Sequence, residues 1–454
     1  MASYKSVNPF TGEEYKTYPL HGSNDISDAL SAAQELSPFA LNFNLEARLQ
    51  GVSRLSKLLR DDQEFLADAI SREMGKVLSE AKAEIEKCAW LCDYYRENAT
   101  AYLAAEEIDL GEDKAIKTFE PLGIVLGIMP WNFPFWQVFR FAVPALLAGN
   151  RVLLKHAPNC PHSAELLENL FQNCFPQGAF KNLRLSNEQA AELLAREEVK
   201  ALSLTGSTQA GSTVAQIAAK HLKPQLLELG GSNAFIIFKD AEIKAAAELA
   251  GRARLMNAGQ SCIAAKRFIV HESLIEDFSK ELIKVFKSYQ LGDPRLSQTE
   301  IGPLARRDLA EKVQEQINKA LNQGADLLLG GKRRDNFIEP TIIRISNKAN
   351  PILQEEVFGP VASLISFNNI EEAIAISNES PFGLGVSLIG KNSSELLKWA
   401  PYFEEGAVFI NELVKSDPRL PFGGVKSSGY GRELGPEGIR SFTNLKTIYI
   451  KESL

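Results

Sequence analysis

Hydrophobic residues recur every three or four positions between residues 26 and 101, which is the spacing of one helix face. The sequence therefore predicts a series of amphipathic helices there, acting as scaffold. Residues 115–120 instead alternate between apolar and polar side chains and follow the turn-rich segment 110–113. This alternation predicts a β-hairpin arm outside the main layers, of a kind that often joins subunits.

From residue 123 onward, short apolar strands alternate with helices. Strands are predicted at 123–129, 151–155 and 199–204, with helices following each of them. A second series starts at 234–238 and continues to about residue 424. Such alternation indicates parallel sheets with crossover helices, in which ligands bind at the carboxyl ends of the strands. We expect two interleaved α/β domains, followed by a late strand at 441–450 that needs a partner.

Composition narrows the class of protein. The chain has 454 residues, 45% of them hydrophobic, so it can bury a large core without disulfides. Its 50 Lys and Arg against 57 Asp and Glu give a net charge of −7, which offers no attraction to nucleic acid or anionic lipid. The first residues lack a signal-peptide core, and the apolar stretches are too short to span a bilayer. We expect a cytoplasmic protein without a nucleic-acid or membrane partner.

Among five sparse cysteines, Cys262 is the candidate nucleophile. It follows a predicted helix, Gly259 frees the backbone just before it, and small neighbours leave its sulfur approachable. A thiolate there could attack a carbonyl carbon, although most single cysteines are buried apolar residues. Cys88 and Cys92 lie four apart on a helix, but no second ligand pair accompanies them, so we predict no metal site.

Polar side chains at the predicted strand ends suggest further chemistry. Asn132 follows the strand ending near residue 129, and its amide could stabilise an oxyanion, although turn Asn residues more often bond local backbone. Glu228 lies among apolar residues, which raise a carboxyl pKa toward that of a general base, unless it is simply ion-paired. Gly206 and Ser207 join a strand to a helix whose free N–H groups could face a phosphate. Lys155, at another strand end, could reach a ribose or phosphate.

Taken together, these segments resemble the aldehyde dehydrogenase superfamily over essentially the whole chain. Seven blocks stand in the family's order: Pro130-Trp131-Asn132-Phe133-Pro134, Gly149-Asn150 with Lys155, Thr205-Gly206-Ser207-Thr208, Glu228-Leu229-Gly230-Gly231, Gly259-Gln260-Ser261-Cys262, Glu355-Glu356-Val357-Phe358-Gly359-Pro360, and Pro421-Phe422-Gly423-Gly424-Val425-Lys426-Ser427-Ser428-Gly429. The resemblance implies an α/β fold of three parts. These are a Rossmann-like cofactor domain (1–101 and 122–229), a catalytic domain (230–426) and a small β oligomerisation arm (102–121 and 427–454) that makes a homodimer or homotetramer.

The resemblance also implies roles for individual residues. Cys262 attacks the aldehyde, the Asn132 amide and the Cys262 backbone N–H hold the oxyanion, hydride passes to a nicotinamide, and Glu228 activates water. The residues expected to contact the cofactor are Pro130, Trp131, Lys155, Pro158, Gly206, Ser207, Gly230, Glu356 and Phe358. Pro158 stands where NAD-selective relatives carry a Glu that repels a 2′-phosphate. We therefore expect NADP to be accepted, with NAD also used and His156 assisting.

The substrate prediction depends on Arg140, eight residues after Asn132. This position is similar to the Arg that binds the distal carboxylate in succinate-semialdehyde dehydrogenases, and Ser416, Ser261 and Trp136 complete the candidate substrate-binding set. Met256 replaces a second such Arg, which could broaden specificity. In the alternative interpretation, Arg140 pairs with a carboxylate of this chain or of a partner subunit, and the enzyme is a general aliphatic or aromatic aldehyde dehydrogenase. Glu228 argues against a coenzyme-A-acylating enzyme, and the intact set of Asn132, Glu228 and Cys262 argues against an inactive binding protein.

Overall fold

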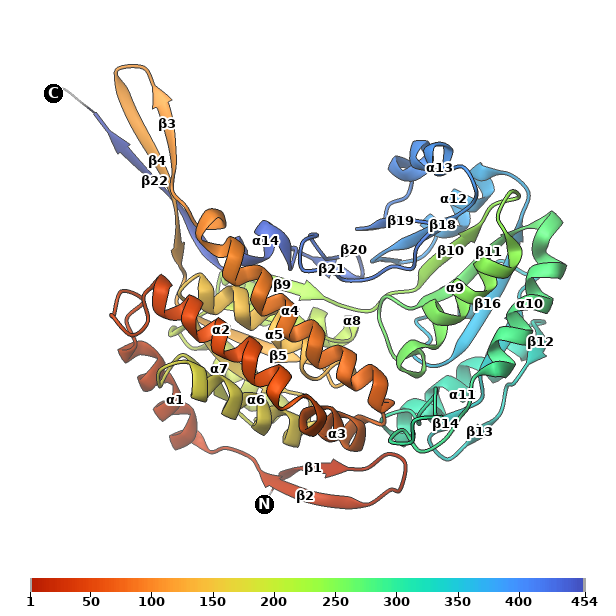
Figure 1. Ribbon diagram of the computed structural model, residues 1–454, viewed down its shortest axis with the longest axis horizontal. Helices are drawn as coiled ribbons and strands as arrows, with labels where there is room; N and C mark the ends of the chain where they lie inside the picture. Colours follow the sequence, from red (N-terminus) through yellow and green to blue (C-terminus); the bar gives the residue numbers. More distant parts are fainter. Residues whose placement is uncertain (1, 452–454) are drawn as a thin grey trace.

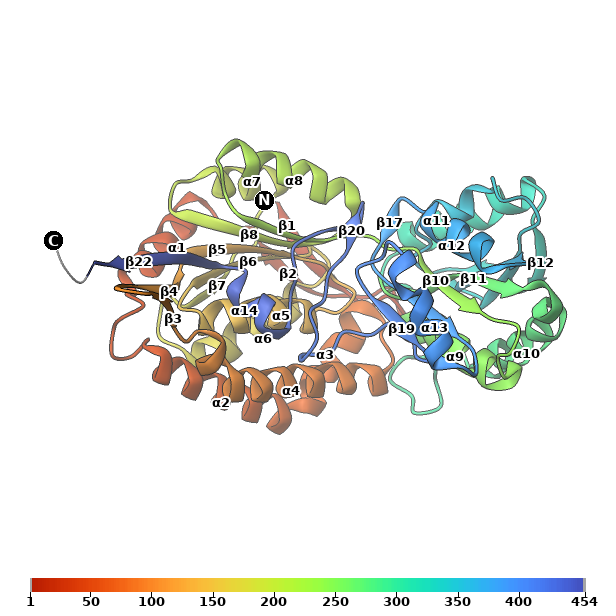
Figure 2. The same ribbon diagram turned by 90° about the horizontal axis from the view of Figure 1, so that it is seen from above.

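The computed structural model describes residues 2–451 as two α/β units, with a β arm extending from the first (Figures 1 and 2). The first unit is built on a six-stranded sheet in the order β21-β9-β8-β5-β6-β7. Its strands are β5 (Ile124–Met129), β6 (Arg151–His156), β7 (Phe180–Asn182), β8 (Val199–Thr205), β9 (Gln225–Glu228) and β21 (Gly429–Tyr430). All pairs are parallel except β21 with β9. The predicted parallel sheet is thus confirmed.

Helices cover both faces of this sheet. The first-unit helices are α1 (Ser23–Glu35), α2 (Leu45–Asp61), α3 (Gln63–Met74), α4 (Leu78–Tyr102), α5 (Trp136–Leu147), α6 (Pro161–Cys174), α7 (Asn187–Ala195), α8 (Thr208–Lys220) and α14 (Gly435–Arg440). α5 packs on β5, β6 and α4, and every one of its residues is buried, including the polar side chains of Gln137 and Arg140 among its apolar residues. α7 and α8 cover the opposite face (Figure 2). An N-terminal hairpin, β1 (Ser3–Val7) and β2 (Glu14–Pro19), packs outside the helices.

The second unit has a seven-stranded sheet in the order β12-β15-β16-β11-β10-β18-β19. Its strands are β10 (Asn233–Ile237), β11 (Ala265–His271), β12 (Asp326–Leu329), β15 (Thr341–Arg344), β16 (Val361–Phe367), β18 (Val386–Ile389) and β19 (Val408–Ile410). Only β12 is antiparallel to its neighbour. The helices are α9 (Ile243–Leu255), α10 (Ile275–Ser288), α11 (Arg307–Asn322), α12 (Ile370–Asn378) and α13 (Ser393–Trp399). Short pairs are β13 (Arg333–Arg334) with β14 (Phe337–Ile338) and β17 (Phe382–Gly383) with β20 (Val425–Lys426).

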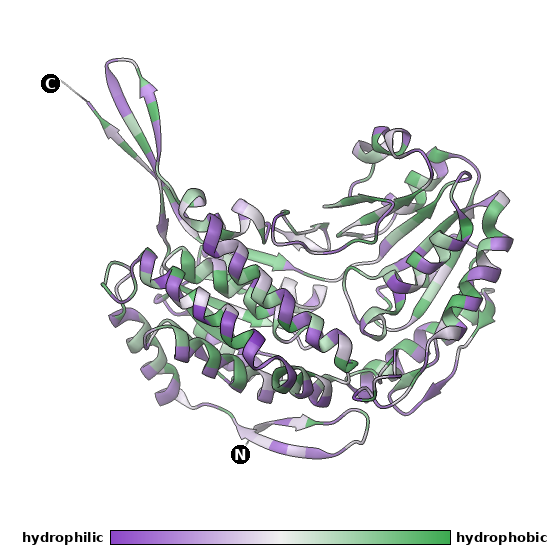
Figure 3. Cartoon of the chain, viewed as in Figure 1, coloured by the Kyte–Doolittle hydropathy of each residue, from purple (hydrophilic) through white to green (hydrophobic). Residues whose placement is uncertain are grey.

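Figure 3 shows the strands of both sheets as mainly hydrophobic, whereas hydrophilic positions follow the outer helix faces. Each sheet is therefore the centre of its own core, because buried parallel strands expose neither face to water. Within residues 2–451, no helix combines the length and the apolar character that crossing a membrane requires.

The arm consists of β3 (Glu106–Leu110), β4 (Asp113–Pro121) and β22 (Thr443–Ile450), paired antiparallel in the order β22-β4-β3. The predicted hairpin and the partner for the late strand are both confirmed, and Figure 1 shows them projecting from the first unit. Part of the range assigned to the arm lies elsewhere, however. β21 extends the first sheet, and α14 packs on α4 and α5, so the C-terminal share of the arm is β22 alone.

Candidate active site

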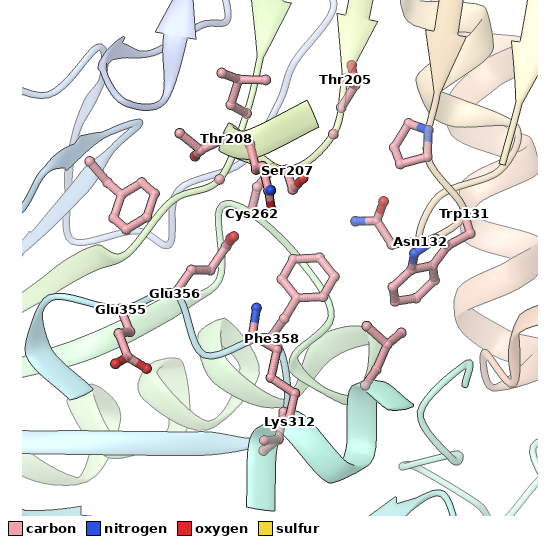
Figure 4. A pocket seen from close by; sticks show the side chains of 18 of the residues that line it. Trp131, Asn132, Thr205, Ser207, Thr208, Cys262, Lys312, Glu355, Glu356 and Phe358 are labelled. Atoms are coloured by element: carbon pink, nitrogen blue, oxygen red, sulfur yellow. The ribbon is translucent and has the colours of Figure 1, made fainter. Parts of the chain in front are cut away.

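A cavity of about 620 Å³ opens where the ends of β5, β8 and β9 face the second unit (Figure 4). Asn132, Thr205 and Ser207 line it from the first unit, while Cys262, Glu356 and Phe358 line it from the second. The carboxyl ends of the first parallel sheet therefore meet the predicted nucleophile, as the strand-helix alternation indicated.

Cys262 is positioned by a tight turn. The 3-10 helix η1 (Met256–Gly259) carries Asn257, Ala258 and Gly259 at positive φ, and a Cβ on Gly259 would lie 2.4 Å from the carbonyl oxygen of Gly359. A glycine is required there because any side chain would clash. Cys262 is partly exposed, whereas the other four cysteines are buried.

Opposing effects act on the Cys262 thiol. Burial raises its pKa to about 11, while the positive charges of Arg140 and Lys266 lower it. Lys266, on β11, donates from Nζ to the carbonyl oxygens of Ser261 and Cys262, both at 2.7 Å. Lys266 therefore fixes the peptide that carries the candidate nucleophile and adds a compensating positive charge beside it.

Asn132 joins the two units at the thiol. Its side-chain Nδ2 donates to the backbone carbonyl oxygen of Gln260 at 3.0 Å. Its backbone carbonyl oxygen accepts from Asn257 Nδ2 at 2.8 Å. An amide nitrogen carries two hydrogens, so one stays free for a second acceptor. Because the side chain lines the cavity beside Cys262 (Figure 4), that hydrogen can serve an oxygen on the attacked carbon.

Glu228 ends β9 and is buried, but it does not line this cavity. Burial raises the pKa of its carboxyl well above the usual range, and the carboxylate of Glu433 raises it further, whereas Arg140 and Arg432 act in the opposite direction. Glu228 makes no ion pair within residues 2–451. A carboxyl with a raised pKa and no fixed partner suits a general base that works near neutral pH.

The cavity also brings together most of the predicted cofactor residues: Pro130, Trp131, Gly206, Ser207, Gly230, Glu356 and Phe358. Ser207 caps α8 by accepting from Ala210 N–H at 3.2 Å. The first turn of a helix also has N–H groups without a helical acceptor, and these can bind a phosphate. Glu356 accepts from Gly231 N–H at 3.0 Å, and a Cβ on Gly230 would lie 2.6 Å from its Oε2. This cradle of glycines and the α8 N-terminus fits a dinucleotide. No group of side chains within 2–451 has the composition of a metal site.

Three of the predicted nucleotide contacts lie outside this cavity. Lys155 is the penultimate residue of β6 and its side chain is buried, which lowers its pKa, while Pro158 is exposed. His156 has both ring nitrogens engaged within the protein. Its Nδ1 accepts from Ala157 N–H at 2.8 Å, which leaves Nε2 to donate to the carbonyl oxygen of Pro134 at 2.9 Å. Burial lowers its pKa to about 4, so the imidazole is neutral and fully engaged.

The predicted substrate residues divide into two groups. Arg140 forms an ion pair with Glu433 of the same chain, both side chains being 2% exposed, and its guanidinium lies 4.7 Å from the Phe422 ring centroid. The structure therefore favours the alternative in which Arg140 meets a protein carboxylate. Trp136, one turn earlier on α5, and Ser416 lie together around Lys87. Ser261 is buried and contributes its carbonyl oxygen to Lys266.

Sequence reasoning missed Glu433, Lys266 and Lys87. Lys266 had a local signal, because a lysine in an apolar strand four residues after the nucleophile needs an acceptor. Glu433 and Lys87 had none, because each becomes notable only through partners far away in the chain.

The geometry agrees with comparisons to known proteins. The profile of the Aldehyde dehydrogenase family matches residues 2–448. This chain belongs to that family. A succinate-semialdehyde dehydrogenase (NADP(+)) 1 of Mycobacterium tuberculosis is 42% identical over 452 residues, covering 98% of this chain and 99% of the relative. The succinate semialdehyde dehydrogenase (NAD(P)+) of Escherichia coli is 39% identical, covering 98% and 97%.

Solved structures support the same assignment. The succinic semialdehyde dehydrogenase of Streptococcus pyogenes, crystallised with NADP+ as the cofactor, superposes with a TM-score of 0.96 at 36% identity and covers 98% of this chain and 99% of that one. The resemblance to aldehyde dehydrogenases and the α/β fold class are thus both confirmed, and the relatives are dehydrogenases of one acid aldehyde.

Proposed function

We propose that this aldehyde dehydrogenase oxidises succinate semialdehyde to succinate with NADP or NAD, without coenzyme A. The observation that carries the proposal is the meeting of one accessible thiol, Cys262, with the Asn132 amide in a cavity built for a dinucleotide. The relatives named for this substrate support the choice of aldehyde.

The chemistry follows from the residues in place. The Cys262 thiol loses its proton to solvent, and the thiolate attacks the aldehyde carbon. The Asn132 amide hydrogen and the Cys262 backbone N–H stabilise the oxygen that becomes negative. The cavity residues would hold a nicotinamide nucleotide, with Lys155 as a candidate contact outside the cavity, and the nucleotide would supply the hydride acceptor. Loss of hydride leaves a thioester on Cys262. Glu228 then takes a proton from water, the hydroxyl adds to the thioester carbon, and the thiolate leaves as succinate forms.

NADP acceptance is proposed from the loop after β6. Pro158 carries no charge, and no acidic residue stands within 156–159, so nothing there repels a 2′-phosphate, whereas Lys155 attracts one. The arm supports assembly into an oligomer, because β22 exposes apolar side chains that include Leu445 and Tyr449, each 58% exposed.

Initial rates test the proposal. Reduced-cofactor formation is measured with succinate semialdehyde and with uncharged butanal, each with NADP and with NAD, in the absence of coenzyme A. We expect a large advantage for the acid aldehyde and measurable rates with both cofactors. Equal rates for the two aldehydes would reassign the substrate to general aldehydes, which the Arg140–Glu433 ion pair favours. Failure to oxidise either aldehyde would overturn the dehydrogenase chemistry itself.

A further inference from the structure

Lys87 places a cation beside two of the predicted substrate residues. It lies on α4, and its Nζ is 4.3 Å from the centroid of the Trp136 ring and donates to Ser416 Oγ at 2.7 Å. Ser416 is 7% exposed and Trp136 is 3% exposed, whereas Lys87 keeps partial access to solvent. A cation held between an aromatic ring and a hydroxyl in this way can bind a small anion.

The charge of Lys87 is not balanced by a protein carboxylate. It makes no ion pair in the described part of the chain, 2–451. The neighbouring Asp417 is held by Arg419 through two contacts, Nε to Oδ1 at 2.9 Å and Nη2 to Oδ2 at 2.7 Å. Glu84, one turn earlier on α4, forms an ion pair with Lys76 and accepts from the N–H groups of Phe135 and Trp136. Both nearby acids therefore have partners of their own, which leaves the ammonium group available.

The position of Lys87 relates it to the reaction. Trp136 begins α5 four residues after Asn132 and one helical turn before Arg140, and it belongs to the apolar cluster against which Cys262 packs. Arg140, the cation predicted from the sequence to bind the substrate, is already paired with Glu433. The Ser416 oxygen accepts from Lys87, so its own hydrogen remains free to donate to a second acceptor.

We propose that Lys87 and the Ser416 hydroxyl together bind the distal carboxylate of the acid aldehyde, with the Trp136 ring as the floor of that subsite. The inference rests on the proposed function and deepens it, because it assigns the acid preference to α4 rather than to Arg140 on α5. The carboxylate would receive one hydrogen bond from the ammonium and one from the hydroxyl, and both would be stronger than bonds to a neutral group.

A charge-selective comparison tests the proposal. Lys87→Met keeps the apolar stem but removes the charge, and Lys87→Arg restores it. We expect Lys87→Met to lower kcat/KM for succinate semialdehyde by at least about 30-fold, mostly through KM, while the loss with butanal stays below about threefold. Lys87→Arg should recover part of the preference. Lys82→Met on the same helix, whose Nζ pairs with Glu64 at 2.6 Å, is the matched control and should not change the ratio.

The pH profile supplies a readout that a structural role would not move. Burial and the charge of Arg140 lower the pKa of Lys87 to about 8, while Cys88, Asp417 and Glu84 act in the opposite direction. The ammonium is charged below that pKa and neutral above it. The ratio of kcat/KM for acid and neutral aldehyde should therefore fall between pH 7 and 9, because effects of the catalytic groups cancel in the ratio. In Lys87→Met the ratio should be low and flat, and in Lys87→Arg it should be flat at a higher level.

Failure of the two proposals can be told apart. If the wild-type enzyme shows no acid preference, the proposed function fails before any variant is made. If the wild type prefers the acid aldehyde and Lys87→Met keeps that preference, or loses activity equally with both aldehydes, the assignment of Lys87 is overturned while the function stands.

Discussion

Replacement of Arg140 by Met tests what this cation holds in place. Arg140 and Glu433 are each 2% exposed, and the charge of Arg140 also acts on the buried Glu228. Removing one partner of a buried pair leaves an uncompensated charge, which costs about 3–5 kcal/mol. We expect Arg140→Met to lower the free energy of unfolding in urea by about that amount, and Glu433→Gln to lower it by less, because the guanidinium keeps its contacts with Phe422 and Thr205.

The double variant separates stability from substrate binding. Arg140→Met combined with Glu433→Gln removes both charges, so it should regain at least half of the stability lost in Arg140→Met. If Arg140 serves mainly to neutralise Glu433, the double variant also keeps its preference for succinate semialdehyde over butanal. Additive losses of stability would contradict the pairing argument. If the double variant instead regains stability but no longer prefers succinate semialdehyde over butanal, Arg140 binds the substrate carboxylate.

The same variant has a pH signature. The guanidinium lowers the pKa of Glu228, which burial and Glu433 raise, so Arg140→Met should shift that pKa further upward. More of the base is then protonated at pH 7, and kcat/KM should fall with both aldehydes and recover as the pH rises. An unchanged acidic limb would refute the electrostatic link between Arg140 and Glu228.

Other predictions concern the thiol, the cofactor loop and the arm. Because burial raises the pKa of Cys262 to about 11, the rate of its alkylation by iodoacetamide without cofactor should rise about tenfold per pH unit between pH 7 and 10. Mass spectrometry measures the alkylation, and Cys262→Ala is the control. A plateau of the rate near pH 8 would contradict that pKa. Pro158→Glu should lower kcat/KM with NADP at least about tenfold and change kcat/KM with NAD by less than about threefold. The reason is that like charges 4 Å apart repel by about 4 kcal/mol at an effective dielectric of 20. Equal losses with both cofactors would mean that this loop does not contact the 2′-phosphate. Leu445→Lys with Tyr449→Lys should reduce the mass measured by light scattering, and an unchanged mass would place the subunit interface elsewhere.

Local sequence was sufficient to predict the strand–helix alternation of both sheets and to single out Cys262 as the candidate nucleophile. Alternating apolar strands predicted both parallel sheets, and the backbone needs of the turn before Cys262 were visible in Gly259. β21 was not predicted, because a strand of two residues has no periodicity to detect and pairs with β9 only in the folded chain.

Long-range partners explain what the sequence left open at the site. Sequence alone could not decide whether Arg140 binds the substrate or a protein carboxylate, because Glu433 stands far away in sequence, although the two share one buried contact. His156 looked available because nothing near it in sequence showed that its ring bonds the Pro134 carbonyl. Lys87 looked like any helical lysine until folding placed Ser416 against it. Residue type and local pattern identify reactive groups. Whether such a group is free to bind a ligand or is already paired within the protein depends on its neighbours in the folded chain.

The pairing of β21 with β9 means that the surroundings of Glu228 are completed late in the translation of this chain. Gly429 lies opposite Glu228, and the carbonyl oxygen of Ser428 accepts from Leu229 N–H at 3.0 Å. While the chain is being made, β9 has an open edge next to the future base until residues beyond 424 emerge from the ribosome. An open edge invites pairing with other nascent chains. Arrival of β21 therefore both protects the growing sheet and completes the surroundings of Glu228, so this site forms only after residues 429 and 430 have been translated.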